Sequence, residues 1–371
     1  MLRLPLQRYA RNRKATIGKN GSVLLLHGAS AASRSFVVPF NRDRGQSAAG
    51  GLVGYLLDRG FDVWTLDHRA SHVVATKPEY AALVRAFTME QIAQKDIPAA
   101  IDAIRKTIGS NVRLSIVGHC VGAAVLAIAA ALGELGRREI KNVVLNTIGL
   151  FYRVPWDTWT KAEDQVLERV LAIAPGCRFI HPDTARYPWP ASLENAFDMW
   201  PTALLPRVGS DLYRRLAFMF GNPYMRSIVP PEIDNDDELR LQFGAMPIAL
   251  YIQCGQNVRR GFAAKFDDSS WSLERRRPVR DVVPKDGVGF LRPEPFQDLN
   301  VTLITGDTNR LWHQDSVVLM HEWLLRAGGR GHKERHILPG YGHQDLLWAD
   351  SKEKRAREKV YPLIEQGLSR M

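Results

Sequence analysis

The sequence LSIVGHCVGAA, residues 114–124, decides the fold of this chain. An apolar run leads into a glycine, a cysteine stands two residues later, and a second glycine opens an alanine-rich run. A nucleophile with glycines at this spacing is typical of a sharp turn from a strand into a helix, with the reactive side chain at its tip. We expect glycine at Gly118 and Gly122 because larger side chains would collide with the neighbouring strand or the incoming helix.

Cys120 is the candidate nucleophile at the tip of this turn. The start of the following helix supplies free backbone N–H groups and a partial positive charge, which favour a thiolate and a developing oxyanion. Cys120 could instead be a small buried apolar residue, since free cysteine is among the most buried residue types. The rest of the sequence has to separate these two interpretations.

Size and composition indicate one folded core with an insertion. The chain has 371 residues, of which 45% are hydrophobic and 24% charged, and this is ordinary for a globular protein with a buried sheet. We expect a first part of the core over 1–149, a cap over 150–295 and a second part of the core over 296–371. The longest apolar run, 121–133, is shorter than the roughly 20 residues that span a bilayer, so we expect no stable membrane insertion.

Charge and cysteine content narrow the expected partners and location. The formal net charge is +11, but no nucleic-acid-binding motif accompanies the densest basic clusters, 11–14 and 275–277, so we expect a solvated basic surface and no nucleic-acid partner. Residues 1–20 lack the apolar stretch of a secretory signal, and a leader strand is expected there rather than a targeting arm. The spacing of the cysteines predicts neither a disulfide framework nor a zinc site, which fits a reducing, cytoplasmic location. The three cysteines are Cys120, Cys177 and Cys254.

Strands and helices alternate on both sides of the turn. This alternation predicts an α/β protein with a mostly parallel sheet, flanked by helices and connected by right-handed crossovers. Apolar strands are expected at 23–30, 61–69, 114–117, 142–148, 301–305 and 335–338. Helices are expected at 51–59, 97–108, 121–133, 315–327 and 352–368.

Between 150 and 295 the alternation breaks into prolines, scattered tryptophans and two helical stretches, 162–173 and 210–220. An aromatic-rich insertion between core strands predicts a cap over the active site that shapes an apolar substrate pocket. The alternative is an ancillary packing domain. The tryptophans considered are Trp156, Trp159, Trp189 and Trp200.

Two residues late in the chain complete a candidate catalytic triad. A nucleophile needs a base to take its proton and an acid to orient that base, and the order nucleophile, acid, histidine is met by Cys120, Asp307 and His343. Asp307 directly follows the strand at 301–305, and His343 stands in a glycine-flanked loop after the last strand, so both are expected at the edge of the sheet where the nucleophile lies. Asp307 could instead be a turn aspartate. Three positions in the expected order favour the triad.

The oxyanion hole is expected from main-chain donors. We predict the backbone N–H of Val121 and that of Ala29 or Ser30, in the loop after the first core strand. The sequence shows no metal cluster and no phosphate-binding or dinucleotide-binding loop, so no cofactor and no metal are expected.

With these residues in place, the chain resembles the α/β-hydrolase superfamily over nearly its whole length. More narrowly, it is similar to the hydrolase-type domains associated with cholesterol-oxidase-like flavoproteins. The closing Gly-Tyr-Gly-His-x-Asp is also similar to that of acid lipases, whose nucleophile is serine, and the turn at Cys120 is similar to that of polyhydroxyalkanoate synthases. The chain lacks the flavin-binding domain of the fused proteins, so the resemblance implies a triad and a capped fold, and steroid chemistry is not carried over from it. The matching pieces are residues 119–122, 143–156, 306–309, 339–343 and 361–364.

The first functional hypothesis is an esterase or thioesterase that forms a thioester acyl-enzyme on Cys120 and resolves it with water. Its substrate would be a small-molecule ester or thioester with an apolar acyl part, either free or bound to a carrier. The second hypothesis is an acyltransferase, or a lactone-forming or ester-forming biosynthetic enzyme, that passes the acyl group to an acceptor other than water. A third is a binding protein on the same fold that has lost catalysis; the complete triad argues against it.

Overall fold

The computed structural model describes residues 2–10, 19–38, 50–109, 111–163, 165, 177–200, 209–267 and 289–370. Its centre is a seven-stranded sheet in the order β1-β3-β2-β4-β5-β8-β9, in which every neighbouring pair is parallel except β1 with β3. The mostly parallel sheet predicted from the sequence is therefore confirmed. The strands are β1 (Leu6–Tyr9), β2 (Ser22–Leu26), β3 (Asp62–Leu66), β4 (Leu114–His119), β5 (Asn142–Asn146), β8 (Asn300–Gly306) and β9 (Lys333–Leu338).

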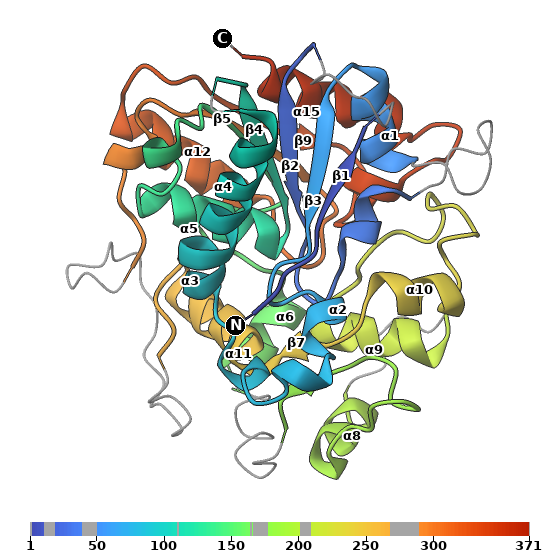
Figure 1. Ribbon diagram of the computed structural model, residues 1–371. Helices are drawn as coiled ribbons and strands as arrows, with labels where there is room; N and C mark the ends of the chain where they lie inside the picture. Colours follow the sequence, from blue (N-terminus) through green and yellow to red (C-terminus); the bar gives the residue numbers. More distant parts are fainter. Residues whose placement is uncertain are drawn as a thin grey trace.

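Helices cover both faces of the sheet (Figure 1). Alternate residues of β2 belong to two different cores, because successive side chains of a strand point to opposite faces. Leu24 and Leu26 pack in the core with α4, α5 and α12, whereas Val23 and Leu25 pack in the core with α1 and α15. These helices are α1 (Gly51–Asp58), α4 (Ile97–Ile108), α5 (Val121–Ala131), α12 (Asp315–Ala327) and α15 (Tyr361–Leu368).

The elements predicted from the sequence are found with small shifts, and one is wrong. The predicted helix 352–368 is two shorter helices, α14 (Ala356–Lys359) and α15. Pro362 stands at the start of α15, where its missing N–H cannot continue a preceding helix but suits the first turn of a new one. The leader segment does contain a strand, β1, which pairs antiparallel to β3. Most of the predicted helix 162–173 and the basic clusters 11–14 and 275–277 lie outside the described residues.

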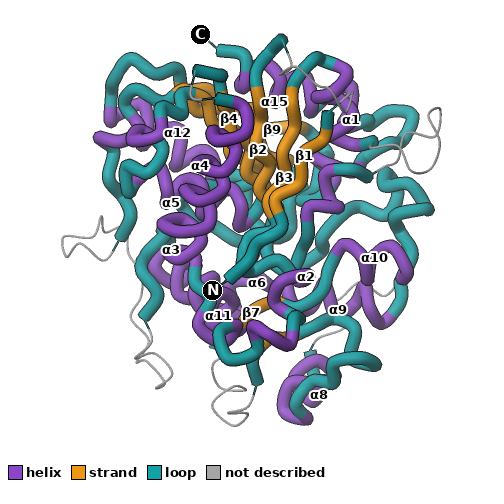
Figure 2. The backbone as a smooth tube through the Cα atoms, viewed as in Figure 1, coloured by secondary structure: helices purple, strands orange, loops and turns teal. Residues whose placement is uncertain are grey.

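The segment between β5 and β8 forms a separate layer beyond one end of the sheet, in the lower part of Figure 1. The tube in Figure 2 shows mostly helices and loops in this layer, with β7 among them. β7 pairs antiparallel with β6 in a separate two-stranded sheet. The predicted helix 210–220 corresponds to α9, which begins after Ser210, whose side chain accepts a hydrogen bond from the N–H of Tyr213. The elements are α6 (Trp156–Glu163), β6 (Phe179–Ile180), α8 (Ala191–Asp198), α9 (Asp211–Phe220), α10 (Asp236–Gln242), β7 (Met246–Pro247) and α11 (Ile248–Arg260).

Three further short α-helices lie among the described residues. They are α2 (His72–Ala75), α3 (Met89–Gln91) and α13 (Asp345–Trp348). Among the described residues, no helix combines the length and the hydrophobicity that crossing a bilayer requires.

Candidate active site

Cys120 lies at the tip of the turn between β4 and α5. Its backbone has φ 57° and ψ −129°, a conformation that costs energy for a residue with a side chain and that is found mainly at functional sites. The turn is closely packed: a Cβ added at Gly118 would lie 2.6 Å from the Cα of Ala123, and one added at Gly122 would lie 2.5 Å from the carbonyl oxygen of His27. The structure therefore shows why both positions need glycine.

The loop after β2 runs directly beside the thiol. A Cβ added at Gly28 would lie 2.8 Å from the Cβ and 3.2 Å from the Sγ of Cys120. The backbone N–H groups of Val121 and Ala29 lie at the sulfur and favour its thiolate form. Two main-chain donors that converge on a nucleophile are the arrangement that stabilises an oxyanion.

Of the two loop residues considered for the oxyanion hole, Ala29 is the one whose N–H lies at the sulfur. Ser30 instead faces the insertion, with a left-handed φ of 56°. Its hydroxyl donates a short hydrogen bond to the carbonyl of Gly244, and its own carbonyl accepts a hydrogen bond of 2.8 Å from the N–H of Gly244. Ser30 therefore connects the loop after β2 to the insertion.

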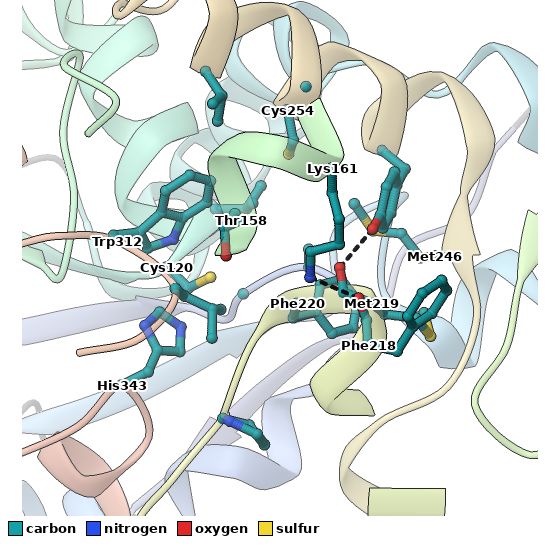
Figure 3. Close-up of a pocket in the computed structure, with 18 of the residues that line it drawn as sticks. Cys120, Thr158, Lys161, Phe218, Met219, Phe220, Met246, Cys254, Trp312 and His343 are labelled. Carbon is teal, nitrogen blue, oxygen red and sulfur yellow. Dashed lines mark hydrogen bonds between the residues drawn. The ribbon is translucent and has the colours of Figure 1, made fainter. Parts of the chain in front are cut away.

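His343 lies next to Cys120, and both side chains line one cavity (Figure 3). The imidazole is 1% exposed, and neither ring nitrogen has a hydrogen-bond partner among the described residues. Burial lowers the pKa of His343 well below its usual value, and the neighbouring His119, whose ring centroid is 5.0 Å away, lowers it further. His343 is therefore neutral at pH 7 and can accept a proton.

The thiol of Cys120 is also in its neutral form. Burial raises its pKa, and this effect outweighs the indole N–H of Trp312 and the backbone N–H groups of Val121 and Ala29, which lower it. The indole N–H lies beside the sulfur without completing a hydrogen bond to any described residue. The two pKa shifts thus favour a neutral Cys120 thiol beside a neutral His343 imidazole.

Asp307 does not contact His343 through a hydrogen bond in this structure. The residue directly follows β8, as predicted, but its side chain is exposed, and its carboxylate accepts a hydrogen bond of 2.6 Å from the backbone N–H of Gly340. The N–H of Asp307 donates to the carbonyl of Leu338 at 3.1 Å, so the residue extends the pairing of β8 with β9. The bond to Gly340 corresponds to the turn aspartate that the sequence left open. The role of Asp307 as the triad acid stays a prediction.

Asn309, in the same loop, is a residue that the sequence analysis missed. It is 3% exposed, and its Oδ1 accepts hydrogen bonds from the N–H groups of Leu311 and Trp312, which fixes the loop that places the Trp312 indole beside Cys120. Its buried Nδ2 has no hydrogen-bond partner in the described part of the chain. The signal in the sequence was the pair Thr308-Asn309, because asparagine commonly bonds the backbone two residues further on.

Three further histidines are buried near the turn at Cys120. The rings of His27 and His68 stack with centroids 4.1 Å apart. Burial lowers the pKa of each of the three to about 3, so all are neutral at pH 7. The three residues are His27, His68 and His119.

The cavity in front of Cys120 has a volume of about 1080 Å³, counted out to its open mouth. Its walls come from both the core and the insertion, and most of its lining side chains are aromatic or aliphatic, as predicted for an apolar pocket. The four tryptophans considered for this wall do not line it, and Trp156 is 67% exposed. The aromatic side chains that line it are Phe218, Phe220, Phe243, Tyr251 and Trp312.

Within the described ranges, no group of three or more His, Cys, Asp or Glu side chains is placed to hold a metal ion. Cys177 and Cys254 are free, and Cys254 lines the same cavity as Cys120. Burial raises the pKa of the Cys254 thiol far above its usual value, so this second thiol is a poor nucleophile.

Comparison with solved structures identifies the architecture. A lipase in its open form matches with a TM-score of 0.55 and 16% identity over 99% of this chain and 95% of its own. A thermostable carboxyl esterase from Bacillus coagulans, in complex with glycerol, matches with a TM-score of 0.57 and 15% identity over 98% of this chain and 94% of its own. This chain has the α/β-hydrolase fold.

Other α/β-hydrolases match in the same way. A soluble variant of the monoglyceride lipase from Saccharomyces cerevisiae, in complex with a substrate analog, has a TM-score of 0.52 and 14% identity over 98% of this chain and 91% of its own. No protein-family model matches the sequence, and no curated protein matches it. At this level of identity the likeness establishes the α/β-hydrolase fold alone, and the chemistry has to be argued from the site.

Proposed function

We propose that this protein is an acyl-transfer enzyme that hydrolyses an ester or thioester with an apolar acyl part, through a thioester on Cys120. The observation on which this rests is the position of Cys120. Its thiol lies at the strained turn between β4 and α5, beside the N–H groups of Val121 and Ala29. It shares an apolar cavity with His343, the neutral base. The names of the matched structures, a lipase, a carboxyl esterase and a monoglyceride lipase, support an ester as the substrate.

In the first half of the reaction, Sγ of Cys120 attacks the acyl carbonyl carbon while His343 takes the thiol proton. The carbonyl oxygen becomes negative and accepts hydrogen bonds from the N–H groups of Val121 and Ala29, each worth about 3 kcal/mol in such a site. The bond to the leaving alcohol or thiol then breaks, and the leaving group takes the proton from His343. The acyl group remains on the sulfur as a thioester.

In the second half, His343 takes a proton from water as the water oxygen attacks the thioester carbonyl. The C–S bond breaks, the carboxylic acid leaves, and the sulfur recovers its proton from His343. Burial lowers the pKa of His343 well below its usual value, so the imidazole is neutral at pH 7. It can therefore take the proton without first forming an ion pair. We assign this chemistry to Cys120 and His343, since the carboxylate of Asp307 bonds Gly340 in the structure.

The second candidate function is transfer of the acyl group to an acceptor other than water. Two observations favour it: Cys120 is 6% exposed, and its cavity is mostly apolar, so water is scarce around the thioester. A thioester also retains more reactivity toward alcohols and amines than an ester does. Product analysis with a competing alcohol separates the two functions, because transfer yields a new ester and hydrolysis yields only the acid.

Intact-mass measurement with p-nitrophenyl esters tests the nucleophile. The wild-type protein is expected to gain the mass of one acyl group during turnover, and the Cys120→Ala variant is expected to gain none and to release no p-nitrophenol above background. Cys254→Ala is the matched control, because Cys254 lines the same cavity, and it is expected to acylate like the wild type. Full acylation of Cys120→Ala would refute the assignment.

A further inference from the structure

Helix α6 places two polar side chains on the wall of the cavity in front of Cys120. Thr158 and Lys161 are three residues apart, so they share one face of the helix, and both line the cavity. Figure 3 shows the Lys161 side chain descending from α6 toward the end of α9, with Thr158 on the side of Cys120 and Trp312. Their chemistry is unlike that of the aromatic and aliphatic wall around them.

Within the described part of the chain, most of the hydrogen-bonding capacity of Lys161 is unused. Its Nζ donates one hydrogen bond of 2.8 Å to the carbonyl of Phe218, and its two other N–H donors have no partner among these residues. The Nζ lies 5.8 Å from the centroid of the Trp200 ring and 5.9 Å from that of Phe218. Burial lowers the pKa of Lys161 to about 8, so the amine still carries its charge for most of the time at pH 7.

Among the described residues, the charge of Lys161 is only weakly balanced. Asp157, one turn earlier on α6, raises the pKa of Lys161, but less than burial lowers it, and the Asp157 carboxylate lies 3.7 Å from the guanidinium of Arg310. No Asp or Glu is among the described residues that line the cavity. A cation in a mostly apolar wall costs free energy unless an opposite charge or acceptor meets it.

Capping the end of α9 does not require a cation. The next carbonyl of that helix, of Met219, is satisfied at 2.5 Å by the neutral hydroxyl of Tyr251. A neutral donor in place of Lys161 would satisfy Phe218 in the same way. The hydroxyl of Thr158 is a second unused group: its Oγ1 is buried and has no hydrogen-bond partner among the described residues.

We propose that Lys161, assisted by Thr158, binds a carboxylate on the substrate, remote from the bond that Cys120 cleaves. This inference rests on the proposed acyl transfer and deepens it, since it makes the substrate an ester or thioester whose apolar skeleton also bears an acidic group. One ammonium group and one hydroxyl match the single charge and two oxygens of a carboxylate. The remaining apolar wall accommodates the skeleton between the two ends.

Paired substrates test the proposal. The p-nitrophenyl half-esters of straight-chain dicarboxylic acids carry the remote carboxylate, and the p-nitrophenyl esters of the matching monocarboxylic acids lack it. For the chain length that reacts best, the wild-type protein is expected to favour the half-ester in kcat/KM. Lys161→Met is expected to lower this preference about 10- to 100-fold, because the half-ester loses far more rate than the neutral ester does. Thr158→Val is expected to lower the preference by a smaller factor.

Lys106→Met is the matched control. Lys106 is exposed on α4, outside the cavity, so this variant removes the same charge from the protein without touching the wall. It is expected to keep the wild-type preference. An unchanged preference in Lys161→Met, or an equal loss with both esters, would overturn the proposal, because a structural cap on α9 would affect both substrates alike.

Equilibrium binding separates failure of this proposal from failure of the proposed reaction. Binding of the unesterified dicarboxylic acids is measured by calorimetry on Cys120→Ala and on the same protein with Lys161→Met. If wild-type protein cleaves neither ester but Lys161→Met still weakens binding about tenfold or more, the subsite stands and the reaction falls. Equal binding by the two proteins overturns the subsite whatever the protein catalyses.

Discussion

An alanine at position 28 would test how closely the loop after β2 approaches Cys120, the proposed nucleophile. The added Cβ would lie 2.8 Å from the Cβ of Cys120 and 3.2 Å from its Sγ. Carbon atoms in contact are about 3.5–4.0 Å apart, so the loop or the thiol must move by about 1 Å. A displacement of this size at the reacting group costs about 100-fold in rate, and the overpacking itself costs about 1–3 kcal/mol of stability.

For Gly28→Ala we therefore expect kcat/KM for a p-nitrophenyl ester to fall about 100-fold, with a folded protein. Initial rates give kcat/KM, the burst of p-nitrophenol reports acylation, and urea unfolding gives the stability. The loss is expected in the acylation step, because both Cys120 and the N–H of Ala29 are displaced from the positions in which they act together.

Gly136→Ala is the matched control for this experiment. A Cβ at Gly136 meets no atom within 4 Å, and its φ is not in the left-handed region, so activity is expected to be unchanged and stability equal or slightly higher. A folded Gly28→Ala protein with the activity of Gly136→Ala would refute the close approach of the loop to the thiol as a catalytic requirement.

Three other predictions concern protonation and the triad. The buried histidines His27, His68 and His119 have a pKa of about 3 in the folded protein and an ordinary value of 6.5 when unfolded. Their contribution to the free energy of unfolding is therefore complete above pH 6.5 and is lost as the pH falls toward 3. Urea unfolding between pH 7.5 and 5 is expected to show this loss, approaching about 4 kcal/mol per pH unit from these three histidines. His343, whose pKa burial also lowers, adds to the loss, and Asp345, whose pKa is raised to about 6, offsets about 1.4 kcal/mol per pH unit of it; an increase of stability toward acid would contradict this. Because burial raises the pKa of Cys120, its alkylation by iodoacetamide, followed by mass spectrometry, is expected to be slow at pH 7 and to accelerate beyond pH 9; fast labelling at pH 7 would show an ion pair with His343. Asp307→Ala is expected to lower kcat/KM less than about tenfold, whereas loss of a triad aspartate costs about 10⁴-fold, so a loss of that size would place Asp307 on His343 during catalysis.

The sheet and the strand-to-helix turn at Cys120 could be predicted because short local stretches of sequence indicate them. Buried strands appear as short apolar runs, and the spacing of Gly118 and Gly122 leaves few alternatives for the backbone between them. The helices at 97–108 and 315–327 have the predicted bounds because each is amphipathic and ends before a glycine, Gly109 or Gly328, with positive φ. The C-terminal helix was wrong because Pro362 starts a new helix there.

The site could be predicted only as far as strand order reaches. The rule that catalytic loops follow the carboxyl ends of strands places Cys120 and His343 at one cavity. It does not decide which side chain of the loop after β8 turns inward. That depends on the bonds from Leu311 and Trp312 to Asn309 and from Gly340 to Asp307, which join residues across the loop and have no periodic signal.

The cavity wall was the least predictable part. Tryptophans were expected there, but the insertion's share of the wall comes mainly from the end of α9, one face of α6 and α11, whose relative placement depends on the packing of the insertion. Lys161 shows the difficulty most clearly: its burial follows from α9 lying over it, and nothing near it in the sequence indicates a buried cation.

The contacts of the loop after β2 make the position of the Ala29 N–H, a donor of the proposed oxyanion hole, depend on the position of the insertion. Ser30 and Gly244 exchange two hydrogen bonds, and the guanidinium of Arg34 holds both carboxylate oxygens of Glu238 on α10, at 2.8 and 2.7 Å. The backbone that directly follows Ala29 is thus held to the insertion at two points, Ser30 and Arg34. In the proposed reaction, a displacement of this half of the insertion would also displace the loop that carries the N–H of Ala29, so we expect access to the cavity and activation of the carbonyl to change together.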